Sequence, residues 1–279
     1  IIIGWNPNIF KIFKEIENGN LNSSKPTILC FNSMDNVEMR AKIDLEYPDQ
    51  KNVRILTRTG NCYNISELGI ANLQAARATI VLDDMLIKDY NIETTILAIR
   101  KNIPKSNVPI IAQFSESINI KILANISGNN VFGVHTNSII ASVTSQSIRN
   151  KFISSVFMDF LDYDGDEIYF YSSDQFVGLS YMQASLYMDK VTLIGIINNV
   201  GEINLNPNKK SLISSGDQLV VIAEDDIITL NVEKDNEVEN SLKEIQINNV
   251  IKNDTNKKSI LFFGWSELGQ EILNKTIPF

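Results

Sequence analysis

The sequence is poor in the residues that most often carry catalysis and metal binding. Its 279 residues include one histidine, His135, and two cysteines, Cys30 and Cys62. The cysteines lack metal-ligand spacing and are too few for a disulfide framework, which predicts a reducing, cytosolic setting. His135 has no obvious Ser, Cys or acidic partner nearby, and the P-loop, H-E-x-x-H and C-x-x-C motifs are absent. We therefore expect no enzymatic activity.

Long apolar runs and an excess of positive charge are also missing. No segment approaches the roughly 20 apolar residues of a membrane-spanning helix. The 25 Lys and Arg residues face 33 Asp and Glu residues, and the net charge of −8 argues against nucleic acid or an anionic membrane as a partner. Hydrophobic residues make up 44% of the chain, enough to bury a core. Because neither an initiator methionine nor a signal peptide is present, we expect the natural chain to begin before Ile1.

One motif occurs near both ends of the chain. An apolar segment runs into Gly4-Trp5, and a second one runs into Gly264-Trp265, each followed by a helical pattern. A repeat at this spacing indicates two copies of a domain-sized unit. We expect residues 259–279 to begin a second unit that is truncated after its first helix.

Residues 1–136 alternate between short apolar runs and segments of helical period. Such runs are typical of parallel strands buried on both faces, and the alternation predicts a doubly wound, Rossmann-like α/β sheet. The first helix is marked by Asn6 as N-cap and Pro7 at its first position. The predicted strands are Ile1–Gly4, Thr27–Phe31, Val53–Thr57, Thr79–Leu82, Val108–Ala112 and Val131–Val134.

Residues 137–162 lack proline and glycine and have apolar residues at helical spacing. This pattern predicts one long helix or two helices at an angle. The apolar side chains of this segment could pack on the preceding sheet, or the segment could cross between subunits of an oligomer. For the second case, the predicted interface residues are Ile140, Val143, Phe152, Val156 and Phe157.

Residues 163–226 predict a smaller α+β module. Its expected strands are Ile168–Tyr171, Val191–Ile197, Glu202–Leu205 and Gln218–Ala223, with a helix near Leu179–Met188 and glycine turns at Gly201 and Gly216. Residues 227–258 are polar and have no sustained period, which predicts a linker.

A dinucleotide site needs G-x-G-x-x-G after the first strand and an acid after the second. The first turn keeps only Gly4 of the three glycines, and Asn32 or Ser33 stands where the acid is expected. We therefore expect no NAD in this first unit. The loops at the carboxyl edge of the sheet still offer candidate ligand residues, and these are Gly4, Trp5, Asn6, Arg58 and Gly60.

Carboxylates cluster between the two predicted modules. Asp162, Asp164 and Asp166 alternate around Gly165, and Ca²⁺ prefers several oxygen ligands of this kind. The segment does not follow the EF-hand pattern. It predicts either a cation site or a solvated hinge.

The order of elements and several strings resemble an RCK (regulator of K⁺ conductance) unit, most closely that of Castor/Pollux-type ion channels. In the first module the strings are Gly4-Trp5, Arg58-Thr59-Gly60-Asn61, the segment 76–82 and Val134-His135. In the small module they are Phe176-Val177-Gly178, Ile194-Gly195-Ile196, Gly201, Pro207 and the segment 216–219, and Gly264-Trp265 then resembles the opening of a tandem second unit.

The resemblance implies a cytosolic ligand-sensing gating ring, formed as a homo-oligomer of four subunits with tandem RCK units. It also implies a pore-forming membrane segment of the same protein and Ca²⁺ as the ring ligand. Two alternatives remain: the nucleotide-sensing ring of a Trk/Ktr-like potassium transporter, and a Rossmann oxidoreductase. The broken glycine fingerprint argues against both.

Overall fold

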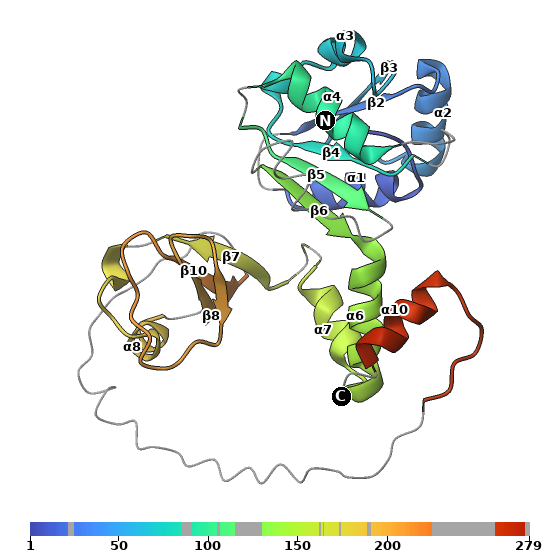
Figure 1. Ribbon diagram of the computed structural model, residues 1–279. Helices are drawn as coiled ribbons and strands as arrows, with labels where there is room; N and C mark the ends of the chain where they lie inside the picture. The colour runs from blue at the N-terminus through green and yellow to red at the C-terminus, as the bar shows by residue number, and fades with distance from the viewer. Residues whose placement is uncertain are drawn as a thin grey trace. The chain divides into compact units, whose positions relative to one another are not determined.

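The computed structural model describes residues 1–21, 25–84, 91–104, 107–114, 130–161, 163, 165–172, 174–188, 191–224 and 260–276. They form two compact units (Figure 1). The large unit comprises Ile1–Ser154 with Trp265–Phe279, and the small unit comprises Ser155–Gly264.

The large unit contains a six-stranded parallel sheet with the strand order β3-β2-β1-β4-β5-β6. The strands are β1 (Ile2–Ile3), β2 (Thr27–Asn32), β3 (Arg54–Thr59), β4 (Thr79–Val81), β5 (Ile110–Phe114) and β6 (Val131–His135). All six strands predicted from the sequence are present, and the prediction of a Rossmann-like sheet is confirmed. The crossover helices are α1 (Asn8–Asn18), α2 (Asn36–Glu46), α3 (Ile65–Leu68) and α4 (Ile92–Asn102).

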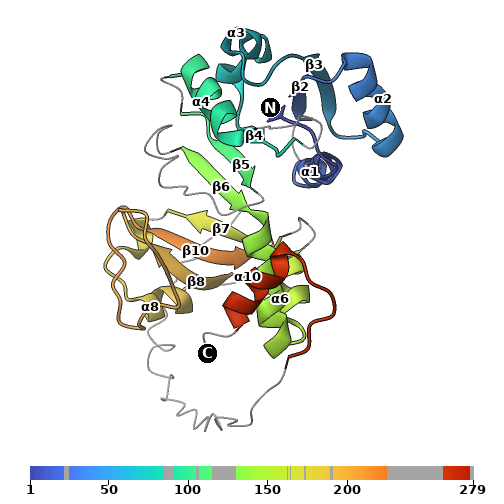
Figure 2. The same ribbon diagram turned by 45° about the vertical axis from the view of Figure 1, so that its right-hand side comes forward.

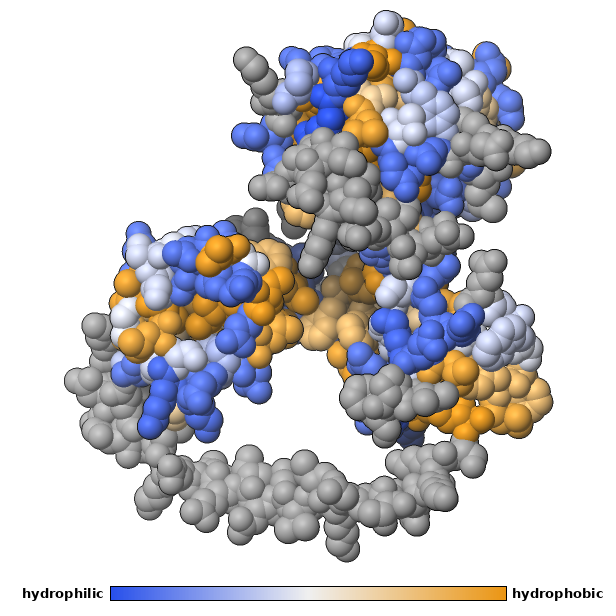
Figure 3. All heavy atoms as spheres, viewed as in Figure 1, coloured by the Kyte–Doolittle hydropathy of each residue, from blue (hydrophilic) through white to orange (hydrophobic). Residues whose placement is uncertain are grey.

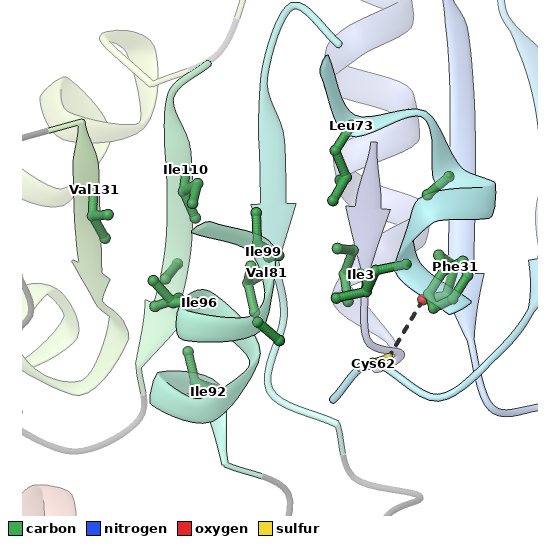
Figure 4. Close-up of a cluster of buried hydrophobic side chains, with 14 of the residues drawn as sticks. Ile3, Phe31, Cys62, Leu73, Val81, Ile92, Ile96, Ile99, Ile110 and Val131 are labelled. Carbon is green, nitrogen blue, oxygen red and sulfur yellow. Dashed lines mark hydrogen bonds between the residues drawn. The ribbon is translucent and has the colours of Figure 1, made fainter. Parts of the chain in front are cut away.

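Helices cover both faces of this sheet. Ile2 and Ile3 are both buried, and they point to opposite faces because side chains alternate along a strand. Ile3 packs in a cluster with α3 and α4, drawn in Figure 4, whereas Ile2 packs in a second cluster with α1 and α2. Each face is therefore a dry helix–sheet interface, which explains the continuous apolar character of the strands.

The start of α1 differs by one residue from the prediction. Pro7 has φ −58° and ψ −21°, and the helix begins at Asn8. The Asn6 Oδ1 atom accepts a hydrogen bond from the Asn8 amide at 3.0 Å. Asn6 thus caps the helix as expected, and the apolar stripe behind it buries Ile9 and Phe13.

Gly60 is required by the close approach of a neighbouring side chain. A Cβ atom at this position would lie 2.4 Å from Cζ of the fully buried Phe31 ring. We predict that Gly60→Ala lowers the free energy of unfolding by about 1–3 kcal/mol, because the buried ring cannot move away. Gly69→Ala is the matched control, since the nearest atom to a Cβ there lies 3.8 Å away. Urea unfolding of both variants tests the prediction, and equal stabilities would contradict it.

The crossover segment consists of two helices, α6 (Thr136–Arg149) and α7 (Ile153–Asp159), separated by residues 150–152. The segment therefore forms two helices and not one long helix. Only Ala141 and Ser145 of α6 are buried, and no residue of α7 is. Most apolar side chains of α6 and α7 are therefore at least partly exposed.

The small unit contains an antiparallel sheet with the strand order β7-β10-β8-β9. Its elements are β7 (Glu167–Tyr171), α8 (Tyr181–Leu186), β8 (Thr192–Ile197), β9 (Ile203–Leu205) and β10 (Gln218–Ala223). Ser180 and Gln183 form a capping box at the start of α8, and Phe176 lies fully buried in the core. Gly201 and Gly216 have φ of 87° and 86°, which confirms the two predicted glycine turns.

The repeated glycine motif has the same backbone conformation at both positions. Gly4 has φ 91° and Gly264 has φ 82°, and each precedes a helix, α1 or α10 (Glu267–Thr276). Residues 260–263 nevertheless form no strand, and the Phe263 side chain is 93% exposed. An apolar segment forms a stable strand only beside other strands. The predicted linker, residues 227–258, lies outside the described residues.

Candidate functional site

The strand order reverses between β1 and β4, and open α/β sheets bind ligands at the carboxyl edge beside such a reversal. The candidate loop Gly4-Trp5-Asn6 lies at this edge. The amide of Gly4 donates to the Phe31 carbonyl at 3.2 Å. Trp5 is 5% exposed, and its ring meets Phe10 edge-on with the centroids 5.9 Å apart. Trp5 is therefore part of the core.

Asn6 is buried and joins three elements at this edge. Its Nδ2 atom donates to the Asp83 carbonyl at 2.8 Å and to Oε1 of Gln113 at 3.1 Å. Its Oδ1 atom caps α1, as described above. Both ends of the amide side chain are thus used within the protein, and Asn6 holds β1, β4 and β5 together.

A second polar pair lies at the same edge. The Asn32 Nδ2 atom donates to the Asp84 carboxylate, while the Asn32 Oδ1 atom accepts from the Met34 amide at 2.8 Å. Asn32 and Asp84 are 1% and 3% exposed. The residue that ends β2 is thus an amide bound to a buried carboxylate of the segment after β4. A nucleotide site would require an acid there, facing a ribose.

Buried side chains occupy the edge where a nucleotide would lie. The Asp84 carboxylate would repel a pyrophosphate, and Pro7 supplies no amide donor at the start of α1. The absence of NAD from the first unit stays a prediction. Asn32 is a residue that the sequence pattern placed at this edge, whereas Asp84 and Gln113 were not predicted there. Asp84 follows the predicted strand Thr79–Leu82 closely enough to lie at the edge.

Arg58 and Gly60 lie at the carboxyl end of β3. The Arg58 side chain is exposed, and its Nη1 atom donates to the neighbouring Thr57 carbonyl at 2.8 Å. It forms no ion pair within the described residues.

His135 ends β6 and stacks on Phe114 with ring centroids 5.6 Å apart, which agrees with a packing role.

Both cysteine thiols are buried, and burial raises the pKa of Cys30 and of Cys62 to about 12. For Cys62, the charge of Asp84 adds to this effect. At pH 8 the thiolate fraction should then be on the order of one in ten thousand. We predict no reaction of the folded chain with Ellman's reagent and release of both thiols in denaturant. Rapid labelling of the folded chain would contradict this.

The proposed cation cluster lies only partly within the described residues. Asp162 and Asp164 are outside them, and Asp166 is exposed. Among the residues that the structure describes, no group of three or more His, Cys, Asp or Glu side chains is placed to hold a metal ion.

Two apolar surfaces are exposed. Of the predicted interface residues, Ile140, Phe152 and Val156 on the crossover are 48%, 68% and 46% exposed, and Val143 and Phe157 are half-buried. The small unit, on which Figure 3 shows a band of hydrophobic residues, exposes a second apolar surface on the sheet face opposite its core. This second surface includes Ile168, Phe170, Ile203 and Leu205.

None of the helices in the described part of the chain is long and apolar enough to cross a membrane.

Residues 137–239 match the sequence model of a family described as Castor and Pollux, part of voltage-gated ion channel. The chain is 24% identical over 234 residues to a probable ion channel CASTOR of Oryza sativa subsp. japonica, covering 81% of this chain and 26% of the relative. It is 22% identical over 276 residues to a probable ion channel POLLUX of Arabidopsis thaliana, covering 95% of this chain and 32% of that relative. The chain thus spans about a quarter to a third of the relatives it matches.

The fold is similar to that of the human SLO3 gating ring, with a TM-score of 0.59 and 18% identity over 80% of this chain and 43% of that one. This similarity confirms the predicted two-lobe architecture. The two relatives are named as ion channels, which agrees with the prediction that the chain is not an enzyme.

Proposed function

We propose that the chain senses a ligand for a cation channel, because residues 137–239 match the Castor and Pollux sequence model and the fold is similar to that of a gating ring. In this proposal four copies form a ring on the cytosolic side of a membrane. A pore-forming segment of the same protein lies in that membrane. The family match over the crossover helices and the small unit is the observation that carries the proposal.

The exposed crossover helices support oligomerisation. A helix pair that leaves side chains such as Phe152 and Val156 exposed has an apolar surface suited to a second copy. We expect Phe152→Glu to shift the chain towards the monomer in sedimentation velocity. Leu45→Glu is the matched control, because Leu45 is 77% exposed on α2, away from the crossover. Assembly that is unaffected by Phe152→Glu would reject this interface.

A ring can gate a pore only if its ligand binds one conformation more tightly than the other. We propose Ca²⁺ as this ligand, with Asp162, Asp164 and Asp166 among the groups that hold it. Carboxylate oxygens are the ligands that Ca²⁺ prefers, and three carboxylates in alternate positions could supply part of its coordination shell.

Calorimetric titration with Ca²⁺, with Mg²⁺ as the comparison ion, tests this proposal. We expect saturable, Ca²⁺-selective binding that is lost when Asp162, Asp164 and Asp166 are all changed to Asn. A variant with Asp44→Asn, Glu46→Gln and Asp49→Asn removes the same charge from an exposed region of the large unit and should bind as before. Unchanged Ca²⁺ binding by the first triple variant would reject these ligands.

The nucleotide-sensing alternative is disfavoured by the buried polar groups at the carboxyl edge. A nucleotide there would have to displace Asn6 and lie beside the Asp84 carboxylate, which costs hydrogen bonds and adds repulsion. We expect no heat of binding for NAD or ATP in the same calorimetric assay. Saturable binding of either nucleotide would favour the Trk/Ktr-like function instead.

A further inference from the structure

A polar cavity of about 330 Å³ lies between α6 and α10, which run side by side in both ribbon views (Figures 1 and 2). Both helices belong to the large unit. The lining residues are Ser142, Ser145, Gln146 and Arg149 from α6 and Lys275 from α10. Neither an acidic nor an apolar side chain is among them.

The spacing on α6 brings its four lining residues to one face, because they stand at positions i, i+3, i+4 and i+7 of a helix. Two contacts seat α10 against this face. The Ser145 and Thr276 hydroxyl oxygens lie 3.0 Å apart, and the Lys275 Nζ atom donates to Ser142 Oγ at 2.8 Å. The lysine is thereby held at the cavity although it is separated from α6 by more than a hundred residues.

The charge of this cavity is opposite to that of the chain. The protein carries a net charge of −8, yet this cavity contains two cations, Arg149 and Lys275, together with two hydroxyls and an amide. Guanidinium, ammonium and hydroxyl donors converging on a small space are the groups that bind phosphate oxygens. We propose that the cavity between α6 and α10 binds a phosphate group, carried by a small soluble molecule or by a lipid headgroup.

A ligand here would bridge two separate parts of the sequence. One wall belongs to the crossover and the other to the helix that we predict to start the second unit. Binding would tighten the contact between them and so join the second unit to the first. This regulatory consequence rests on the proposed gating function, whereas the binding itself does not.

Both cations also stand in the last turns of their helices, where positive charge stabilises the exposed carbonyl groups. If that is their whole role, the cavity binds no anion. Lys101 provides a matched control, because it is an exposed cation in the last turn of α4. A phosphate site requires Arg149 and Lys275 for binding but does not require Lys101.

The first experiment establishes that α10 lies on α6 in solution. We expect Ser145→Cys combined with Thr276→Cys to form a disulfide under mild oxidation, because the two hydroxyl oxygens are 3.0 Å apart. The native cysteines are buried and should not compete. Absence of this disulfide would overturn the proposal, because the cavity would not exist.

The second experiment titrates the wild-type chain with pyrophosphate in a calorimeter and measures its flotation with phosphatidylcholine vesicles that contain phosphatidylserine. Arg149→Gln and Lys275→Gln should each weaken binding by on the order of tenfold, and Lys101→Gln should leave it unchanged. Binding of pyrophosphate alone indicates a soluble ligand, and binding of the vesicles alone indicates a lipid headgroup. No binding to either, or equal binding by Lys101→Gln and both cavity variants, would overturn the proposal.

Discussion

Replacing Phe13 by alanine is expected to lower the free energy of unfolding of the large unit by about 3–5 kcal/mol. Phe13 is fully buried between α1 and the sheet. Its ring meets Phe10 and Tyr47 edge-on, with centroid distances of 6.0 and 5.7 Å. Truncation to alanine removes both ring pairs and leaves a cavity, because the surrounding residues belong to two elements that cannot easily collapse onto each other.

Tryptophan fluorescence during urea unfolding measures this loss in a Trp265→Phe background, because the remaining Trp5 belongs to the same cluster. Phe263→Ala is the matched control, since that ring is 93% exposed and its loss should change stability by less than about 0.5 kcal/mol. Similar stabilities of the Phe13→Ala and Phe263→Ala chains would show that the packing of α1 contributes little.

Removing the side-chain amide of Asn32 is expected to lower the free energy of unfolding by about 3 kcal/mol. Asn32→Ala removes the donor that binds the buried Asp84 carboxylate. It also removes the acceptor that binds the Met34 amide. Buried polar groups that lose their partners carry the full cost of desolvation. The variant should therefore unfold at a lower urea concentration with an unchanged slope of the transition.

A double-mutant cycle isolates the contribution of the pair. We expect a coupling energy of about 1.5–3 kcal/mol between Asn32→Ala and Asp84→Ala. Asn32→Leu with Asp84→Leu should be more stable than Asn32→Leu alone, because the buried carboxylate is then removed together with its donor. Additive effects in the cycle would mean that the two side chains do not interact.

The alternation of short apolar runs and helical segments was sufficient to predict the large unit. Ile2 and Ile3 illustrate why, since a strand buried on both faces requires apolar residues at successive positions. The sequence could not decide whether α6 and α7 are one continuous helix or two helices. Residues 150–152 contain neither proline nor glycine, so no local signal distinguishes a bend from a continuous helix.

The polar edge was harder to predict because its contacts are far apart in the sequence. Asn6 meets Gln113, and Asn32 meets Asp84, only after the sheet has brought β1, β2, β4 and β5 together. The cavity between α6 and α10 has the same character, because a serine of the crossover contacts a lysine near the end of the chain. Pattern and propensity describe neighbours in the sequence, and these sites are made of neighbours in space.

The position of β1 in the centre of its sheet also constrains the order of folding. Ile2 pairs with Cys30 on one side and with Ile80 on the other. During synthesis, the first three strands can associate as soon as they emerge, but the other edge of β1 stays open until β4 has been made. Pairing across such separations is slow, and an open apolar edge can pair wrongly. This unit should therefore depend on chaperones more than a sheet of consecutive hairpins would.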